Sequence, residues 1–438
     1  VTEANRVERA KGLLRADVAY AVETVGLKFN WAFDIDTTYA NPQEMILSLP
    51  ASARFPVGEH WLPRPETEAG YQLFRSMIQT TMADYPGIST ITLWSRNSRS
   101  ASFGGLTTGM ERADLPPDYQ AIYDAAPERA QTPYAAGHVY HARVAEAVRR
   151  ALDELGHRDV ALGFGSWWRE DPDGNMASDN FAAADHFLPT EVTFYPLDYY
   201  MAFGTNPAFR EHLRDIGASR RLILIEWAQH DDGGHLGRPY QPPVDFADKL
   251  EAIGADGYGV IHWMTRPLDL FFKNLQAQVW SHSRNAPLRA SVDRMARDYF
   301  GPAAAAPMAD YLYAWITTAP RFGRETGDEL GGESSTRSNS NVEDFAARAE
   351  GCKRRIALLD RVDPQQLSPD ALEAWHYFRS HEAWIRLFHL AQENGNPALQ
   401  RETIRAYAES IQFDGGPTRG ELGILIQHNL KWLRTTSN

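Results

Sequence analysis

Short apolar runs alternate with longer stretches of helical periodicity over the first two thirds of the chain. Runs rich in β-branched and aromatic residues indicate strands, and apolar residues three and four positions apart indicate amphipathic helices. The sequence predicts strands at residues 27–36, 89–95, 159–167, 191–198, 221–227 and 257–263. It predicts helices at residues 5–25, 66–85, 140–156, 206–217 and 244–254. Strands that alternate with helices favour a parallel sheet covered on both faces.

The pattern changes near residue 286, after which no further strand is predicted. Helices are predicted at residues 289–300, 303–316, 342–359, 368–392, 396–411 and 419–433. A connector rich in glycine, serine and asparagine separates the second of these helices from the third. We therefore expect a (β/α) barrel catalytic domain at residues 1–285 and an α-helical C-terminal domain at residues 286–438.

The fold class that this pattern favours is α/β, a (β/α)8 TIM-type barrel followed by an all-α domain. Such a barrel has eight strands, and six are predicted here. If the strand at 257–263 is the eighth, the first two strands are absent from this sequence. The alternatives are an open doubly wound sheet or two unrecognised strands. No glycine-rich dinucleotide fingerprint follows any predicted strand, which argues against a Rossmann fold.

The composition and net charge of the chain argue against some classes of binding partner. The chain has 44 Lys and Arg against 57 Asp and Glu, a net charge of −13, which argues against nucleic acid because phosphate binding needs a basic surface. No apolar run of about 18 residues predicts a membrane span. The single cysteine, Cys352, allows no internal disulfide and no thiolate zinc site, and we expect it to be an ordinary helix residue. No cofactor or metal is expected, and localisation stays open between cytoplasm and secretion.

Polar and aromatic residues gather where the predicted strands end. Barrel enzymes carry their catalytic groups at the carboxyl ends of the strands. Carboxylates supply the acid and base for glycosidic cleavage, tryptophan faces stack on sugar rings, and arginine binds carboxylates through two hydrogen bonds. The strand ends and the residues after them include Asp34, Asp36, Trp94, Arg96, Trp167, Trp168, Arg169, Glu170, Asp198, Glu226, Trp227, His262, Trp263 and Arg266. Together these residue types favour carbohydrate chemistry.

Three carboxylates are the catalytic candidates. Glu226 interrupts an otherwise apolar strand, where an unpaired charge would be costly, and we predict that it acts as base or nucleophile. The alternative is a structural ion pair with a neighbouring arginine. Asp198 is predicted to assist, and capping of a turn is its alternative role. Glu170 follows two tryptophans and is the candidate general acid.

The remaining strand-end residues are predicted to bind the substrate. Tryptophans would line a sugar subsite, namely Trp94, Trp167, Trp168, Trp227 and Trp263. Arginines would bind a substrate carboxylate if the sugar is a uronate, namely Arg96, Arg169 and Arg266. Asp34 and His262 complete the set, with loop capping and a satisfied core histidine as their alternative roles.

The segment at residues 254–284 reads GADGYGVIHWMTRPLDLFFKNLQAQVWSHSR. It resembles the last barrel strand and the following helix of α-glucuronidase-like glycoside hydrolases, which also carry a helical C-terminal region. The resemblance implies that Asp198 and Glu226 match carboxylates on two successive late strands that act as candidate bases. The general acid of that family ends an earlier strand, and this chain has Ser95 and Arg96 there. Glu170 is our substitute, and Glu59 or a glutamate of residues 96–137 is the alternative.

The function that these observations favour is a glycoside hydrolase that acts on a terminal sugar of an oligo- or polysaccharide by two-carboxylate catalysis. One alternative is a non-catalytic carbohydrate-binding protein, because Ser95 and Arg96 stand where an acid is expected. The other is a metal-dependent lyase or isomerase that uses the HDDGGH stretch at residues 230–235. A carbohydrate is the expected partner, and the helical domain could support a homo-oligomer.

Overall fold

The computed structural model describes residues 3–96, 105–131, 135–168, 178–198, 202–227, 245–261, 279, 287–319, 345–394 and 397–410. The chain divides into two compact units. The first unit holds Val1–Glu226 and Leu250–Gly259, and the second holds Trp227–Lys249 and Val260–Asn438. The predicted domain boundary at residue 285 stays a prediction.

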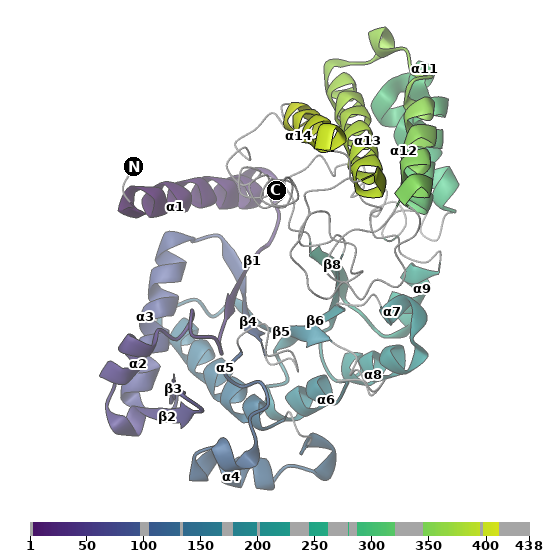
Figure 1. Cartoon of the computed structure of the whole chain (residues 1–438). Helices are drawn as coiled ribbons and strands as arrows, with labels where there is room; N and C mark the ends of the chain where they lie inside the picture. Colours follow the sequence, from purple (N-terminus) through teal and green to yellow (C-terminus); the bar gives the residue numbers. More distant parts are fainter. Residues whose placement is uncertain are drawn as a thin grey trace. The chain divides into compact units, whose positions relative to one another are not determined.

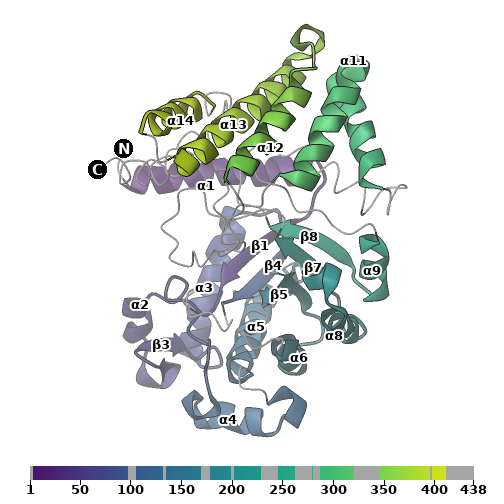
Figure 2. The same cartoon turned by 45° about the vertical axis from the view of Figure 1, so that its right-hand side comes forward.

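A curled six-stranded sheet forms the centre of the first unit (Figures 1 and 2). Its order is β1 (Phe29–Asp34), β4 (Ile88–Ser95), β5 (Ala161–Trp168), β6 (Thr193–Asp198), β7 (Ile223–Trp227) and β8 (Gly257–Ile261). Neighbouring strands from β1 to β7 run parallel. The α/β class and the six predicted strands are therefore confirmed. The described residues place six strands in this sheet, so closure into an eight-stranded barrel stays a prediction.

Helices cover one face of this sheet (Figure 2). They are α3 (Glu68–Asp84), α5 (Ala136–Glu154), α6 (Ser178–Phe187) and α8 (Pro207–Gly217), and each packs against the next. Phe164 of β5 points into this layer, with its ring centroid 5.5 Å from that of His141 and 6.3 Å from that of Phe181. Because side chains alternate along a strand, the residues on either side of Phe164 belong to the other face.

Capping explains where two of these helices begin. The Thr67 hydroxyl accepts a hydrogen bond from the Gly70 amide at 3.2 Å, ahead of α3. The Asn206 side chain accepts from the Ala208 amide at 3.0 Å, and Pro207 occupies the first turn of α8. Both residues satisfy amides that the first turn of a helix leaves without a helical partner.

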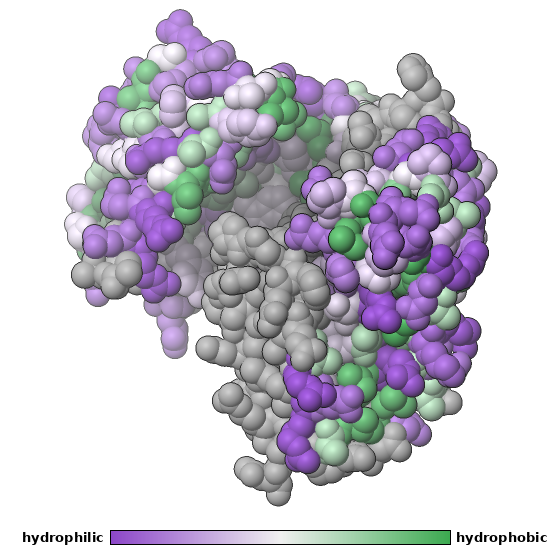
Figure 3. All heavy atoms as spheres, turned by 90° about the horizontal axis from the view of Figure 1, so that it is seen from above, coloured by the Kyte–Doolittle hydropathy of each residue, from purple (hydrophilic) through white to green (hydrophobic). Residues whose placement is uncertain are grey.

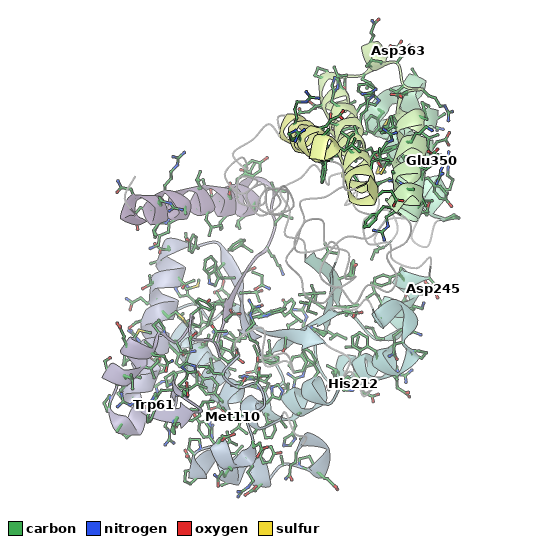
Figure 4. The ribbon with its side chains drawn as sticks, in the orientation of Figure 1. Trp61, Met110, His212, Asp245, Glu350 and Asp363 are labelled. Carbon is green, nitrogen blue, oxygen red and sulfur yellow. The ribbon has the colours of Figure 1, made fainter. Side chains whose placement is uncertain are left out.

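The N-terminal part of the first unit holds one predicted helix and one hairpin that was not predicted. α1 (Glu3–Ala19) continues into a short π-helix, Tyr20–Thr24, and Arg15 pairs with Asp84 at the end of α3. The antiparallel hairpin consists of β2 (Arg54–Val57) and β3 (His60–Pro63). Trp61 of β3, labelled in Figure 4, has its ring 5.2 Å from the Arg54 guanidinium.

Several short helices connect the larger elements. They are α2 (Gln43–Ser48), Ala51–Ala53, Arg112–Asp114, α4 (Pro117–Asp124), Glu128–Ala130, α7 (Ala202–Thr205) and α9 (Phe246–Ala252).

Where it is described, the second unit consists of helices and turns, apart from Trp227 at the end of β7 and the end of β8. Its helices are α11 (Leu288–Thr318), α12 (Phe345–Leu359), α13 (Pro369–Asn394) and α14 (Pro397–Ser410), with a 3-10 turn at Pro364–Gln366. α12 packs against α11 and α13, and α13 packs against α14. Two helices were predicted where α11 lies. Gly301, with a φ of 80°, breaks the helical backbone there, so the two predicted helices meet at a kink.

The surface of the protein is mainly hydrophilic, as the mixture of polar and apolar residues in the sequence predicts. Hydrophilic residues occupy most of the coloured surface in Figure 3, with smaller hydrophobic patches between them. Within the described residues, no helix combines the length and the apolar character that crossing a bilayer requires.

Cys352 lies on α12 and is completely buried. Burial raises the pKa of its thiol, and the thiolate is the form that reacts. We therefore expect Cys352 in the native protein to be unreactive towards a disulfide reagent such as Ellman's reagent, and to react fully in denaturant. The measurement is the absorbance of the released thiolate with and without denaturant. Rapid labelling of the native protein would contradict the predicted structural role.

Candidate functional site

The carboxyl ends of β1 and β4 bring together two of the predicted binding residues. Asp34 ends β1 and is in register with Trp94 on β4. Nε of Arg96 donates a hydrogen bond to Oδ1 of Asp34 at 2.9 Å. About a quarter of each side chain is exposed, 25% for Arg96 and 23% for Asp34. The pair therefore presents hydrogen-bond donors and acceptors side by side at this edge of the sheet.

Two aromatic rings lie over β5 on the sheet face opposite the helices. Gly165 and Gly163 flank Phe164, and a Cβ atom at Gly163 would lie 2.5 Å from the ring of Tyr195. A Cβ atom at Gly165 would overlap the ring of Trp94. Both rings therefore need glycine beneath them. A flat aromatic surface of this kind suits the apolar face of a sugar ring.

Tyr195 was not among the predicted binding residues. The signal that could have found it is the spacing of the two glycines in the strand segment LGFGSW. Glycine inside a strand often marks a close approach by another group.

A buried polar network lies beside the Asp34–Arg96 pair, and we call it the Asp36 network. Oδ1 of Asp36 accepts from the Arg96 amide at 2.8 Å. Oδ2 accepts from the hydroxyl of Ser95 at 2.9 Å and from the hydroxyl of Thr107 at 2.5 Å. Nε2 of His141 on α5 lies 3.5 Å from the same oxygen. All of these side chains except that of Arg96 are fully buried. The network therefore joins the residues that follow β1, the end of β4, α5 and the segment at residues 105–110.

This network contains serine, histidine and aspartate, but it is not arranged for acyl transfer. In a catalytic triad the serine and the aspartate contact different nitrogens of the histidine. Here Nε2 of His141 faces both Ser95 at 3.3 Å and Asp36, while Nδ1 faces Nδ1 of His138 at 3.1 Å. Ser95 and Thr107 donate their hydroxyl protons to Asp36. The contacts of these oxygens with Nε2 of His141 therefore need a proton on that nitrogen, and we infer that Nε2 carries one. Ser95 is also completely buried, which leaves its hydroxyl out of reach of a substrate.

The charge of Asp36 makes the network sensitive to acid. Burial raises the pKa of Asp36, but hydrogen bonds and charge from His141, the Arg96 amide and Thr107 outweigh burial and hold this pKa below its ordinary value of 3.8. A carboxylate whose pKa is lowered on folding stabilises the protein above its unfolded pKa, and this contribution is lost as the pH falls through the folded pKa.

We expect Asp36→Asn to cost about 1–3 kcal/mol of unfolding free energy at neutral pH, because it unbalances buried hydrogen bonds. The difference in unfolding free energy between the wild type and the variant should shrink below about pH 4, because the wild type then loses the stability that the Asp36 carboxylate contributes. Urea denaturation of both proteins across this pH range measures the difference. A deficit that stays constant down to about pH 2 would show that Asp36 keeps its ordinary pKa.

The late strands place two of the catalytic candidates next to each other. In the parallel register, Trp168 on β5 pairs with Asp198 on β6, and Asp198 pairs with Glu226 on β7. The Asp198 carboxylate is completely buried, and its Oδ2 accepts from the Phe203 amide at 2.6 Å. The Asp198 carboxylate thus satisfies an amide in the first turn of α7, which is the kind of contact that its alternative capping role would make. For Trp167, Trp168, Glu226 and Trp227 only the backbone is described, so their catalytic and binding roles stay predictions.

Several predicted residues lie outside the described part of the chain. They are Arg169, Glu170, His262, Trp263, Arg266 and the HDDGGH stretch at residues 230–235. Among the described residues, no group of three or more histidine, cysteine or carboxylate side chains is arranged to hold a metal ion. The metal-dependent alternative therefore stays untested. Glu59, which does lie in the described part, sits in the turn between β2 and β3.

Comparisons with known proteins find likeness in structure alone. No protein-family profile and no curated protein matches the chain. A mutant O-GlcNAc hydrolase of Thermobaculum terrenum is similar with a TM-score of 0.47 and 12% identity, over 98% of this chain and 82% of that one. A GH138 enzyme that targets pectin rhamnogalacturonan II is similar with a TM-score of 0.38 and 9% identity, over 88% of this chain and 61% of that one. Both likenesses are distant and concern the fold.

Proposed function

We propose that this protein is a glycoside hydrolase that removes a terminal sugar from an oligo- or polysaccharide. The observation that carries the proposal is the register at the carboxyl edge of the sheet. This register aligns Asp198 with Glu226 on neighbouring strands and Asp34 with Trp94 at the other end of the same edge. Carboxylates, an arginine and aromatic rings at one edge of a parallel sheet suit the cleavage of sugar linkages.

The mechanism we propose uses two carboxyl groups. One protonates the glycosidic oxygen as the bond to the anomeric carbon breaks, and the other activates water or attacks that carbon. Glu226 is the proposed base or nucleophile, and Glu170 is the proposed acid. Asp198 is completely buried and its carboxylate is fixed by the Phe203 amide, so it would assist without touching the sugar, by placing negative charge behind the site where positive charge develops on the anomeric carbon.

The sugar would bind at the β1–β4 end of the same edge. The ring of Trp94 would stack on a sugar face, and the Asp34–Arg96 pair would exchange hydrogen bonds with hydroxyl groups. If the sugar is a uronate, its carboxylate would bind Arg96, Arg169 and Arg266. The α-glucuronidase resemblance favours the uronate, whereas the contact of Arg96 with Asp34 leaves part of its charge already balanced.

The experiment is a screen of aryl glycosides and uronate-capped oligosaccharides, read by released aryl alcohol or reducing sugar, with and without a chelator. Release from one sugar class that is insensitive to chelator would support two-carboxylate hydrolysis. Activity that the chelator abolishes and a divalent ion restores would favour the metal-dependent alternative. NMR of the first product would then give the anomeric outcome, retention for carboxyls about 5–5.5 Å apart and inversion for about 6.5–9.5 Å.

A second candidate function is non-catalytic carbohydrate binding. The residues at the end of β4 favour it, because the α-glucuronidase-like hydrolases have their general acid at this position. Ser95 there is buried against Asp36, and Arg96 is paired with Asp34. Sugars that raise the melting temperature while no glycoside is cleaved on long incubation would support this second function over the first.

A further inference from the structure

Arg96 is held at three points along its length. Its amide donates to Asp36 at 2.8 Å, its carbonyl oxygen accepts from the Thr108 hydroxyl at 3.0 Å, and its Nε donates to Asp34 at 2.9 Å. The backbone of Gly105 also lies against it, because a Cβ atom there would sit 2.5 Å from the Arg96 carbonyl oxygen. A surface arginine loses considerable side-chain entropy when it is fixed in this way, which suggests that its position matters.

The groups that fix Arg96 from behind cannot themselves touch a substrate. Asp36, Ser95, Thr107 and His141 are all completely buried. The Asp36 carboxylate receives two hydroxyl donors on one oxygen and the Arg96 amide on the other. Loss of the Thr107 hydroxyl would therefore alter the position of the Asp36 carboxylate and, through its bond to the Arg96 amide, the position of Arg96.

We propose that Asp36, Thr107 and His141 are positioning residues that hold Arg96 at the carboxyl edge of the sheet, where it binds the sugar. The proposal rests on the proposed function, in which Arg96 contacts the substrate. A binding group that is fixed in advance loses less entropy when the ligand arrives, so a group that is free to move binds the ligand more weakly. We expect the acid-base chemistry to be unaffected, because Asp198 and Glu226 lie on β6 and β7 and not on the strands that carry Arg96 and its contacts.

The test uses an isosteric pair of variants at Thr107. Thr107→Val removes the hydroxyl that donates to Asp36 and keeps the shape, whereas Thr107→Ser keeps the hydroxyl. Thr403→Val is the matched control, because Thr403 is equally buried and its hydroxyl donates to a main-chain carbonyl in the second unit. Each Thr107 variant is also made in an Arg96→Ala background.

Three readouts are taken on the full chain. The first is KM and kcat for the aryl glycoside that the screen finds fastest. The second is the dissociation constant of glucose and of glucuronate by calorimetry, which serves if no glycoside is cleaved. The third is hydrogen exchange at the Arg96 amide, which does not depend on function.

We expect Thr107→Val to raise KM or the dissociation constant about tenfold and to leave kcat within about twofold. Exchange at the Arg96 amide should accelerate, Thr107→Ser and Thr403→Val should resemble the wild type, and Thr107→Val should add no further effect in the Arg96→Ala background. The positioning role would be overturned, while the proposed function stands, if Thr107→Val left the exchange at the Arg96 amide or the affinity for sugar unchanged. It would also be overturned if Thr107→Val weakened binding as much in the Arg96→Ala background as in the wild type. A wild type that neither cleaves nor binds any of these sugars would overturn the proposed function and, with it, this inference.

Discussion

Replacement of Glu226 by glutamine is expected to lower kcat/KM by about a thousandfold or more and to leave the fold intact. Glutamine has nearly the same size and shape as glutamate, but it can neither accept a proton nor attack the anomeric carbon. Glu226 stands next to Asp198 in the register of β6 and β7. The measurement is kcat/KM on the glycoside that the screen identifies, with circular dichroism and the melting temperature to show that the variant is folded.

Glu211→Gln is the matched control for this variant. Glu211 lies on α8 with 71% of its side chain exposed, so the same chemical change should alter neither rate nor stability. Azide added to Glu226→Ala would refine the result, because a small anion can take the place of a missing nucleophile or base and yield a glycosyl azide. A folded Glu226→Gln protein with wild-type activity would remove Glu226 from the mechanism and favour its structural alternative.

The strands of the sheet were predictable because their sequences carry the signal locally. Buried parallel strands read as continuous apolar runs, and residues 222–225, with the sequence LILI, form such a run. The β2–β3 hairpin had no such signal. Each of its strands has four residues, and Pro56 and Pro63 lie within them, where proline argues against a strand. The predicted closure into a barrel rests on the alternation of strands and helices and on a family resemblance, because closure depends on the curvature of the whole sheet and no single segment carries a signal for it.

The candidate site was predictable in part for a related reason. Residues at the carboxyl ends of parallel strands meet at one edge whatever lies between them, so Asp34 and Arg96 could be named although 62 positions separate them. The Asp36 network has no such rule. Thr107 comes from the segment at residues 105–110 and His141 from α5, and neither position carries a local pattern that points to Asp36. They meet because α5 and the segment at residues 105–110 both pack against the ends of β1 and β4.

A buried ion pair in the helical unit should give the largest stability effect. Nε and Nη2 of Arg355 donate to the two carboxylate oxygens of Glu382 at 2.6 and 3.0 Å, and both side chains are almost completely buried. We expect Glu382→Leu to cost about 3–5 kcal/mol of unfolding free energy, because it leaves the arginine charge buried without its partner. Urea denaturation gives the loss, and hydrogen exchange of α12 and α13 shows whether the helical unit is the part that unfolds.

The same pair is expected to contribute little beyond what apolar residues would. Burial raises the pKa of Glu382 and outweighs the attraction of Arg355, which lowers it, so the desolvation of this carboxylate opposes the gain from pairing. The double variant Glu382→Leu with Arg355→Met should therefore regain most of the stability that the single variant loses. Arg379 and Asp360 form the control, since their pair at 2.9 Å is about half exposed and Asp360→Asn should cost less than about 1 kcal/mol. A double variant as unstable as the single one would show instead that the hydrogen bonds of Arg355 and Glu382 stabilise the helical unit in a way that packing cannot replace.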